Sequence, residues 1–302
     1  MDEKRMKFID FFAGIGGFHS GLEKAGMECI GWCEFDKFAQ KSYRAMYDTT
    51  NLWFGDDVTK VKGSELPKAD LWTFGFPCQD VSVAGKRKGL KEGTRSGLFY
   101  EMMRLLDECK ENKPEWIMCE NVKNLLSIDE GRGFLEVVCE MAERGYTVEW
   151  KVCNSKDYGV PQNRERVFII GRLRNGCAEN ILYKPDQSEQ SIIQVGNIIK
   201  TESFGGNPQR GRVYSPHGLS PTLNCVEGGG LEPKILLSRN PNVIRKLTPR
   251  EFWRLQGFTD QQFDACAKMM SNAQLYKQAG NAVTVSVVEE IGRHIMEIVS
   301  PF

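Results

Sequence analysis

The chain has 302 residues, of which 41% are hydrophobic and 26% are charged, enough for one large domain with a smaller one beside it. Its 40 Lys and Arg residues balance its 40 Asp and Glu residues, so overall charge does not favour a polyanion-binding protein. No apolar run is long enough to span a bilayer, and the charged N-terminus carries no signal-peptide pattern. We therefore expect a cytoplasmic protein that has no membrane partner.

The distribution of cysteine and histidine argues against disulfides and metals. The ten cysteines are scattered along the chain, and without a secretion signal we expect reduced thiols. No CxxC pair occurs, and the three histidines lie far apart, at His19, His217 and His294. We expect no metal site.

In chain order, the first 175 residues alternate strand-like apolar runs with helix-like amphipathic ones. Strand patterns cover 7–12, 28–34, 70–76, 115–120, 146–154 and 166–172. Helical patterns lie between them, one ending at residue 25 and the others at 37–47, 96–110 and 133–143. This alternation predicts an α/β fold with a doubly wound, mostly parallel sheet whose ligand site lies at the carboxyl ends of the strands.

The pattern changes after Arg174. Residues 205–230 contain seven glycines and three prolines and have no helical periodicity, which predicts a smaller, loop-rich β module. Residues 191–250 hold eight Lys and Arg against three Glu, so this module can contact phosphates, although a chance cluster of solvated charges is the alternative. Helical patterns return at 248–255 and in the apolar segment 282–298.

A glycine-rich turn follows the first predicted strand, in the sequence DFFAGIGG that begins at Asp10. A dinucleotide fingerprint starting at Gly14 would need a third glycine at position 19, where the chain has His19. Glu34 ends the second strand 20 residues after Gly14, where a carboxylate can accept hydrogen bonds from ribose hydroxyls. These features favour an adenosine ligand without phosphates, such as S-adenosylmethionine, over a turn with only a structural role.

Two further strand ends carry polar chemistry. Cys78 follows a strand within the sequence GFPCQ, and the loop after it holds five cations, which lower the pKa of a nearby thiol. The alternative is that Cys78 is a small core residue. Glu120 and Asn121 end the next strand, where a carboxylate is a candidate acid unless it only caps the following turn.

Six segments, in order and spacing, resemble the motif set of bacterial and phage cytosine-C5 DNA methyltransferases. They are FIDFFAGIGGF, GFPCQDVSVAGKRKGL, ENVKNLL, QNRERVFIIG, RKLTPREFWRLQGF and QAGNAV. The resemblance covers about 7–171 and 246–299. It implies the S-adenosylmethionine-dependent methyltransferase fold, with residues 1–175 and 280–302 forming a discontinuous catalytic and cofactor-binding domain. Residues 176–279 would form the target-recognition domain and a returning hinge helix.

The resemblance also implies a mechanism. Cys78 would attack C6 of a cytosine flipped out of double-stranded DNA, so that C5 can take the methyl group of S-adenosylmethionine. Glu120 would contact N3 and the exocyclic amine of the base, Arg166 would contact the base, and Arg164 would be an assisting cation. The base that removes the C5 proton is not identified.

The matched binding positions form two sets. Phe35 stands where relatives commonly have tryptophan, and either Asp56 or Asp57 could face the adenine. The positions matched to the cofactor are Phe12, Ala13, Gly14, Gly16, Gly17, Glu34, Phe35, Asp57, Val58, Pro77, Leu98, Asn281, Ala282 and Val283. The positions expected at DNA lie in residues 79–97, which correspond to a mobile loop in the family, and in the glycine-rich module. They are Gln79, Ser82, Lys86, Arg87, Lys88, Arg95, Arg210, Arg212, Tyr214 and Thr222.

Three other functions compete with this interpretation. RNA-modifying relatives typically carry extra residues after their Cys-Gln pair, which this chain lacks. A catalytically silent DNA-binding regulator would not need Cys78, Glu120 and Arg166 together, and His19 argues against a nicotinamide oxidoreductase. We expect a monomer that acts on double-stranded DNA, with a cognate restriction endonuclease as a candidate partner. The recognition sequence is not predicted.

Overall fold

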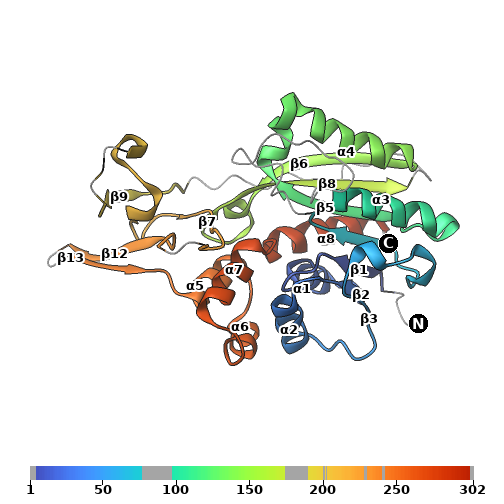
Figure 1. Cartoon of the computed structure of the whole chain (residues 1–302), viewed down its shortest axis with the longest axis horizontal. Coiled ribbons are helices and arrows are strands. Elements are labelled where there is room, and N and C mark those ends of the chain that lie inside the picture. The colour runs from blue at the N-terminus through green and yellow to red at the C-terminus, as the bar shows by residue number, and fades with distance from the viewer. Residues whose placement is uncertain are drawn as a thin grey trace.

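The computed structural model describes residues 5–76, 97–173, 190–199, 201, 203–227, 230–239 and 242–299. A seven-stranded sheet forms the centre of its larger part (Figure 1). Across the sheet the strands are β3 (Trp53–Gly55), β2 (Glu28–Cys33), β1 (Lys7–Phe11), β4 (Leu71–Phe74), β5 (Trp116–Val122), β8 (Glu165–Leu173) and β6 (Tyr146–Asn154). All neighbouring pairs are parallel except those that β8 makes with β5 and β6. The expected doubly wound, mostly parallel sheet is confirmed.

Helices cover both faces of this sheet. On one face, α3 (Leu98–Cys109) and α4 (Arg132–Glu143) share a buried apolar cluster with the sheet that includes Phe99, Met141 and Ile117. On the other face, α1 (Gly17–Lys24) and α8 (Val285–Val299) pack around Phe8 and Trp116. Burial on both faces explains why the strands are continuous apolar runs without alternation.

The last helix lies against the first, although they are separated by most of the chain. At Gly21 an added Cβ would lie 2.6 Å from the Val288 side chain, and at Gly17 it would lie 2.6 Å from Val283. Only glycine allows so close an approach of two helices. The apolar segment expected to be helical at 282–298 is therefore α8, which closes one face of the N-terminal sheet.

Three helices lie directly before α8 in the chain. They are α5 (Pro249–Leu255), α6 (Asp260–Ala267) and α7 (Asn272–Asn281), and with Ile15 and Leu223 they form a third apolar cluster. Thr248 caps α5 in a capping box with Glu251, as Thr-Pro at that point predicts. The sequence patterns did not predict α6 or α7, nor the short strand β3. The remaining helix of this part is α2 (Lys37–Met46). Asp36 caps its N-terminus, where the Asp36 side chain accepts hydrogen bonds from two backbone amides.

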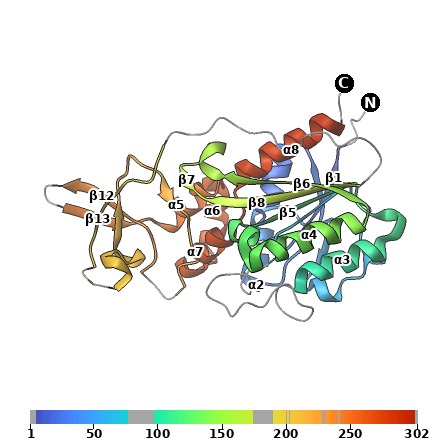
Figure 2. The same cartoon turned by 90° about the horizontal axis from the view of Figure 1, so that it is seen from above.

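The smaller part is a four-stranded sheet that projects from one end of the molecule (Figures 1 and 2). Its strands, in spatial order, are β13 (Asn242–Lys246), β12 (Lys234–Arg239), β10 (Arg212–Tyr214) and β9 (Gln194–Asn197). Two short paired strands, β7 (Gln162–Asn163) and β11 (Ser220–Pro221), join the two parts. We call the four-stranded sheet and its loops, residues 191–246, the small β module.

Three features of the described ranges concern cysteines, membrane-spanning helices and metal-binding side chains. The eight cysteines within these ranges are all free thiols. No helix in these ranges is long and apolar enough to cross a membrane. The same ranges contain no cluster of three or more His, Cys, Asp or Glu side chains able to hold a metal ion.

Candidate active site

Several of the predicted catalytic and cofactor-binding residues lie at one edge of the large sheet. β1, β2, β3, β4 and β5 are parallel, so their carboxyl ends meet at the same edge. β8 is antiparallel to β5, so its first residues lie at that edge as well. The edge therefore brings together the glycine turn after β1, Glu34 after β2, Gly75 after β4, Glu120 in β5 and Arg166 in β8.

Glu120 and Arg166 form an ion pair at this edge. Arg166 lies opposite Val122 in the β5–β8 register, which makes it the diagonal neighbour of Glu120. Arg166 Nε lies 3.2 Å from Glu120 Oε1, and the two side chains are 17% and 15% exposed. Arg166 also donates to its neighbour's carbonyl, Glu165 O, at 2.8 Å. Strand register fixes this acid–cation pair, and both of its side chains are partly exposed.

The chain enters the Pro-Cys segment beside Glu120. A Cβ added at Gly75 would lie 3.6 Å from Glu120 Oε2, and the Asn121 amide donates to Phe76 O at 3.4 Å. Asn121 is 2% exposed, so β5 positions the residue that precedes the Pro-Cys pair. Our prediction for Cys78 falls outside the described residues, as do those for Pro77, Gln79, Ser82, Lys86, Arg87, Lys88 and Arg95.

Arg164 is placed differently from Arg166. Its side chain is 2% exposed, and its guanidinium donates to three backbone carbonyls, Leu223 O at 3.3 Å, Gly280 O at 3.2 Å and Ala282 O at 2.9 Å. Burial and, to a smaller extent, the charge of Arg166 lower the pKa of Arg164 to about 9, so the group stays cationic at neutral pH. Arg164 therefore connects the strand end to Leu223 of the small β module and to the segment 280–282 that precedes α8.

Gln162 extends this connection. Its side chain accepts from Leu223 N at 3.2 Å and donates to Leu255 O at 2.9 Å. Gln256, which is fully buried, donates to Ala279 O at 2.8 Å. Sequence reasoning assigned no role to Gln162, although it begins the QNRER motif that carries both arginines. We call Gln162, Arg164 and Gln256 the junction residues, because together they bond backbone from both parts of the chain.

The glycine turn and Glu34 contact one another directly. Glu34 Oε2 accepts from Gly14 N at 2.7 Å, and its Oε1 accepts from Asp36 N at 2.6 Å. Burial raises the pKa of Glu34, while these backbone hydrogen bonds act to lower it. Gly14 has a φ of +56°, and an added Cβ there would meet no atom within 4 Å. Open space beside a fixed carboxylate suits a bound nucleoside.

The other glycines of the turn serve packing. At Gly16 an added Cβ would meet the Tyr47 ring at 2.5 Å, and at Gly17 it would meet Val283 at 2.6 Å. Phe12, the residue after β1, has a φ of +53°. Ala13 is buried at 7% exposed. The turn therefore combines one glycine that borders open space with two that allow close contact.

The remaining residues matched to the cofactor differ in exposure. Phe35 is 74% exposed, and Asn281 is also exposed and accepts from the Cys225 thiol at 2.8 Å. Asp57 accepts from the Thr59 hydroxyl at 2.7 Å, and this bond lowers the pKa of Asp57. Asp56 pairs with Lys37 at 3.8 Å on the surface. The apolar members are buried or half-buried: Val58, Leu98, Ala282 and Val283.

The residues expected at DNA that the structure describes differ in burial and in hydrogen bonding. Arg210 is exposed, whereas Arg212 donates to Asn207 O at 3.1 Å. Tyr214 is only 7% exposed. Thr222 donates to Asn163 O at 2.6 Å, which connects β11 to the strand end that carries Arg164 and Arg166. Their roles at DNA stay predictions.

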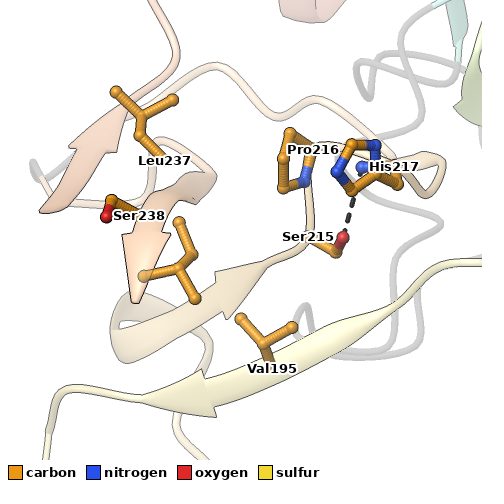
Figure 3. Close-up of a pocket in the computed structure, with 7 residues that line it drawn as sticks. Val195, Ser215, Pro216, His217, Leu237 and Ser238 are labelled. Atoms are coloured by element: carbon orange, nitrogen blue, oxygen red, sulfur yellow. Dashed lines mark hydrogen bonds between the residues drawn. The ribbon is translucent and has the colours of Figure 1, made fainter. Parts of the chain in front are cut away.

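A depression of about 170 Å³ lies within the small β module (Figure 3). Val195, Leu236 and Leu237 line it from two strands, and residues 215–217 close one side. Ser215 accepts a hydrogen bond from His217 N at 3.2 Å there. None of the residues at the large sheet's edge lines this depression, so it is separate from the acid–cation pair.

Comparison with known families gives matches over most of the chain. The family model described as C-5 cytosine-specific DNA methylase matches residues 6–209 and 183–297. The chain is 33% identical to type II methyltransferase M.HhaI of Haemophilus parahaemolyticus, over 96% of this chain and 94% of that protein. It is 29% identical to the orphan methyltransferase M.SPBetaI of Bacillus phage SPbeta, over 97% and 98%.

Solved structures share the fold at lower identity. The Dnmt2 methyltransferase of S. pombe has a TM-score of 0.75 and 18% identity, with 98% of this chain and 100% of that chain covered. A putative DNA modification methyltransferase encoded within an E. coli prophage has a TM-score of 0.65 and 19% identity, covering 97% and 99%. At these identities the likeness concerns the fold alone.

Proposed function

Because the chain belongs to the C-5 cytosine-specific DNA methylases, we propose that it methylates C5 of one cytosine in a short double-stranded recognition sequence with Cys78 as the nucleophile. The observation that carries the proposal is the Glu120–Arg166 pair beside Gly75, three residues before Cys78. An acid and a cation held next to the segment that bears a thiol are what addition to a pyrimidine ring requires.

The chemical need for a nucleophile follows from the base. Cytosine C5 is a weak nucleophile, but a Cys78 thiolate that forms a bond to C6 pushes the electron pair of the C5–C6 double bond onto C5. C5 can then take up the methyl group. Loss of the C5 proton to a base restores the double bond and releases the thiolate. The chain needs no other covalent step.

Glu120 and Arg166 stabilise charge on the ring while Cys78 is bonded to it. Glu120 would hold N3 and the exocyclic amine, and Arg166 would contact the base from the neighbouring strand. Hydrogen-bonding groups that are already fixed by a sheet need little reorganisation as charge develops, which is the main source of such stabilisation. Arg164, bound to three carbonyls, acts as the assisting cation from behind Arg166.

The residues at the glycine turn fit S-adenosylmethionine as the methyl donor. This donor supplies the methyl group as an electrophilic sulfonium. Glu34 would hold its ribose, the exposed Phe35 ring would stack on its adenine, and Asp57 and Asn281 would border it. The open space beside Gly14 supports this assignment because a nucleoside would occupy it.

The target cytosine has to leave the duplex to reach this edge, at a cost of roughly a few kcal/mol. The small β module and the cationic segment 79–97 would contact the flanking DNA. The proposal includes a monomer in the cytoplasm, with S-adenosylmethionine and DNA as its substrates. Its biological role would be DNA modification, either together with a restriction endonuclease or without one, because its relatives include both type II and orphan phage methyltransferases.

Bisulfite sequencing tests the proposal. In a host without cytosine-C5 methylation, DNA should resist conversion at one short motif when the chain is expressed. Cys78→Ala should reduce this methylation by about 10⁴-fold or more, because the nucleophile is lost. Cys139→Ala is the matched control, since this thiol is exposed on α4, and it should methylate as the unmodified chain does.

Two results would overturn the proposal. Uniformly converted DNA from cells with the folded chain would exclude the DNA enzyme, and full activity of Cys78→Ala would exclude the nucleophile. The RNA alternative is tested with purified protein and a labelled methyl donor. If the chain methylated tRNA in preference to duplex DNA in that assay, tRNA would be the substrate and the proposed chemistry would stand.

A further inference from the structure

Lys234 is a nearly buried lysine in the small β module. It begins β12 and lies opposite Val213 of β10 in the parallel register. Although it belongs to a residue type that is almost never buried, it is 7% exposed. A buried ammonium needs partners for all three of its donors.

Three backbone carbonyls supply those partners. Lys234 Nζ donates to Arg210 O at 2.6 Å, Gly230 O at 3.0 Å and Glu232 O at 3.3 Å. Arg210 lies in the segment that leads into β10, and Gly230 ends the glycine-rich segment. Arg210 and Gly230 are 20 residues apart in sequence, and Arg210 is one of the residues predicted to face DNA. One side chain therefore sets the distance between them.

Neighbouring charges and hydrogen bonds support the position of the Lys234 ammonium. Glu232 is 11% exposed and pairs with Lys246 at 3.1 Å, and its negative charge favours the charged form of Lys234. Burial acts in the opposite direction and lowers the pKa of Lys234. On the N-terminal side of Gly230, the Asn224 side chain accepts from Val226 N at 2.9 Å and donates to Leu231 O at 3.5 Å.

We propose that Lys234 is a positioning residue for DNA sequence discrimination: its ammonium holds the Arg210 segment and the Gly230 segment at the spacing at which they read the target. The proposal rests on the proposed DNA methyltransferase function. Lys234 itself contacts no base. It acts through the two backbones, so losing it changes which sequences are accepted and leaves the acid–cation pair at the large sheet unchanged.

Lys234→Met tests this, because it keeps the length of the side chain and removes its donors. We expect KM for cognate duplex DNA to rise by about ten- to hundredfold, as for loss of hydrogen bonds to a charged donor. The kcat at saturating DNA and the KM for S-adenosylmethionine should change less than about threefold. Bisulfite maps should show methylation at sequences one base removed from the cognate motif.

Lys246→Met is the matched control. Lys246 is the register partner of Lys234 in β13, so the variant removes the same charge from the same sheet, but its ammonium pairs with Glu232 at the surface and is 51% exposed. We expect unchanged discrimination. Thermal unfolding is measured for both variants. If Lys234→Met does not fold, Lys234→Arg decides, because it keeps the charge while its planar fork cannot place three donors at one point.

The outcomes separate the two proposals. The role of Lys234 would be overturned if a folded Lys234→Met or Lys234→Arg variant had the same DNA sequence discrimination and the same KM for DNA as the unmodified chain. An equal loss in Lys246→Met would assign the effect to charge and overturn it as well. Absence of methylation by the unmodified chain would instead refute the proposed function itself.

Discussion

The edge of the large sheet and the small β module hold their functional groups by opposite means. At the sheet edge, Glu120 and Arg166 are attached to buried neighbouring strands, and strand register brings them together. In the small β module, Arg210 and Gly230 lie outside the strands, and the buried Lys234 side chain holds the backbone at both positions. The sheet edge fixes side chains through backbone pairing, whereas the module fixes backbone through side chains.

This difference separates chemistry from recognition. A register slip of one residue would turn Glu120 to the other face of the sheet, and the close packing on both faces of β5 and β8 opposes it, because each buried side chain would have to fit a different site. A loop held by single side chains can change with one substitution. We therefore expect changes at the sheet edge to lower kcat and changes in the module to alter DNA affinity and discrimination.

The largest effect should come from Glu120→Gln. The variant keeps the shape of the side chain but removes the negative charge next to Arg166. We expect kcat to fall by about a hundred- to thousandfold, the loss typical of one group that stabilises developing charge. The KM for DNA should change little, because Glu120 lies outside the module. Single-turnover methylation of a cognate duplex measures both.

Glu165→Gln is the control for this variant. Glu165 begins the strand that carries Arg166, and its carboxylate pairs with Lys123 at 2.9 Å while 43% exposed. Exposed pairs contribute about 0–1 kcal/mol, so kcat should be nearly unchanged. A Glu120→Gln enzyme that turns over as fast as Glu165→Gln would break the separation between the two regions.

Arg164→Met should have the next largest effect and should affect both regions. It leaves Leu223 O, Gly280 O and Ala282 O without their buried donor, so the free energy of unfolding should fall by about 3 kcal/mol. The carbonyls belong to segments that border both predicted ligands. KM for DNA and KM for S-adenosylmethionine should therefore rise together, as measured by steady-state kinetics beside urea unfolding.

Arg172→Met provides the comparison on the same strand. Arg172 lies at the other end of β8, where it pairs with Glu115 at 3.2 Å and stacks over Trp116 while 29% exposed. We expect a loss of about 1 kcal/mol or less and unchanged KM values. If the two variants behave alike, Arg164 contributes only to stability and does not couple the two parts.

The sequence predicted the large sheet well because its signals are local. Each buried strand is a short apolar run, and Glu34 and Glu120 come directly at strand ends, so their meeting at one edge follows from parallel pairing alone. The short β3 and the helices α6 and α7 were missed. β3 has three residues, too few for a period to show, and the two helices have weak apolar periodicity.

The junction and the small β module could not be predicted in the same way. Arg164 and Arg166 are two residues apart in one motif. Only the tertiary contacts show that Arg166 faces Glu120, while Arg164 is buried against carbonyls from two later segments. Lys234 resembles any surface lysine in sequence. Contacts between a side chain and distant backbone leave no local pattern, so the residues that hold the module were not found.

The smallest effect should come from Arg210→Gln. Arg210 is exposed, and Lys234 holds its backbone, so the substitution should remove one phosphate contact without moving the segment. We expect the Kd for duplex DNA to rise a few-fold at about 0.1 M salt and the slope of log K against log salt to fall by about one. Lys24→Gln, at the exposed end of α1 away from the strand ends, should leave that slope unchanged. An equal change in both would mean that affinity follows total charge, and the module would then have no special place in binding.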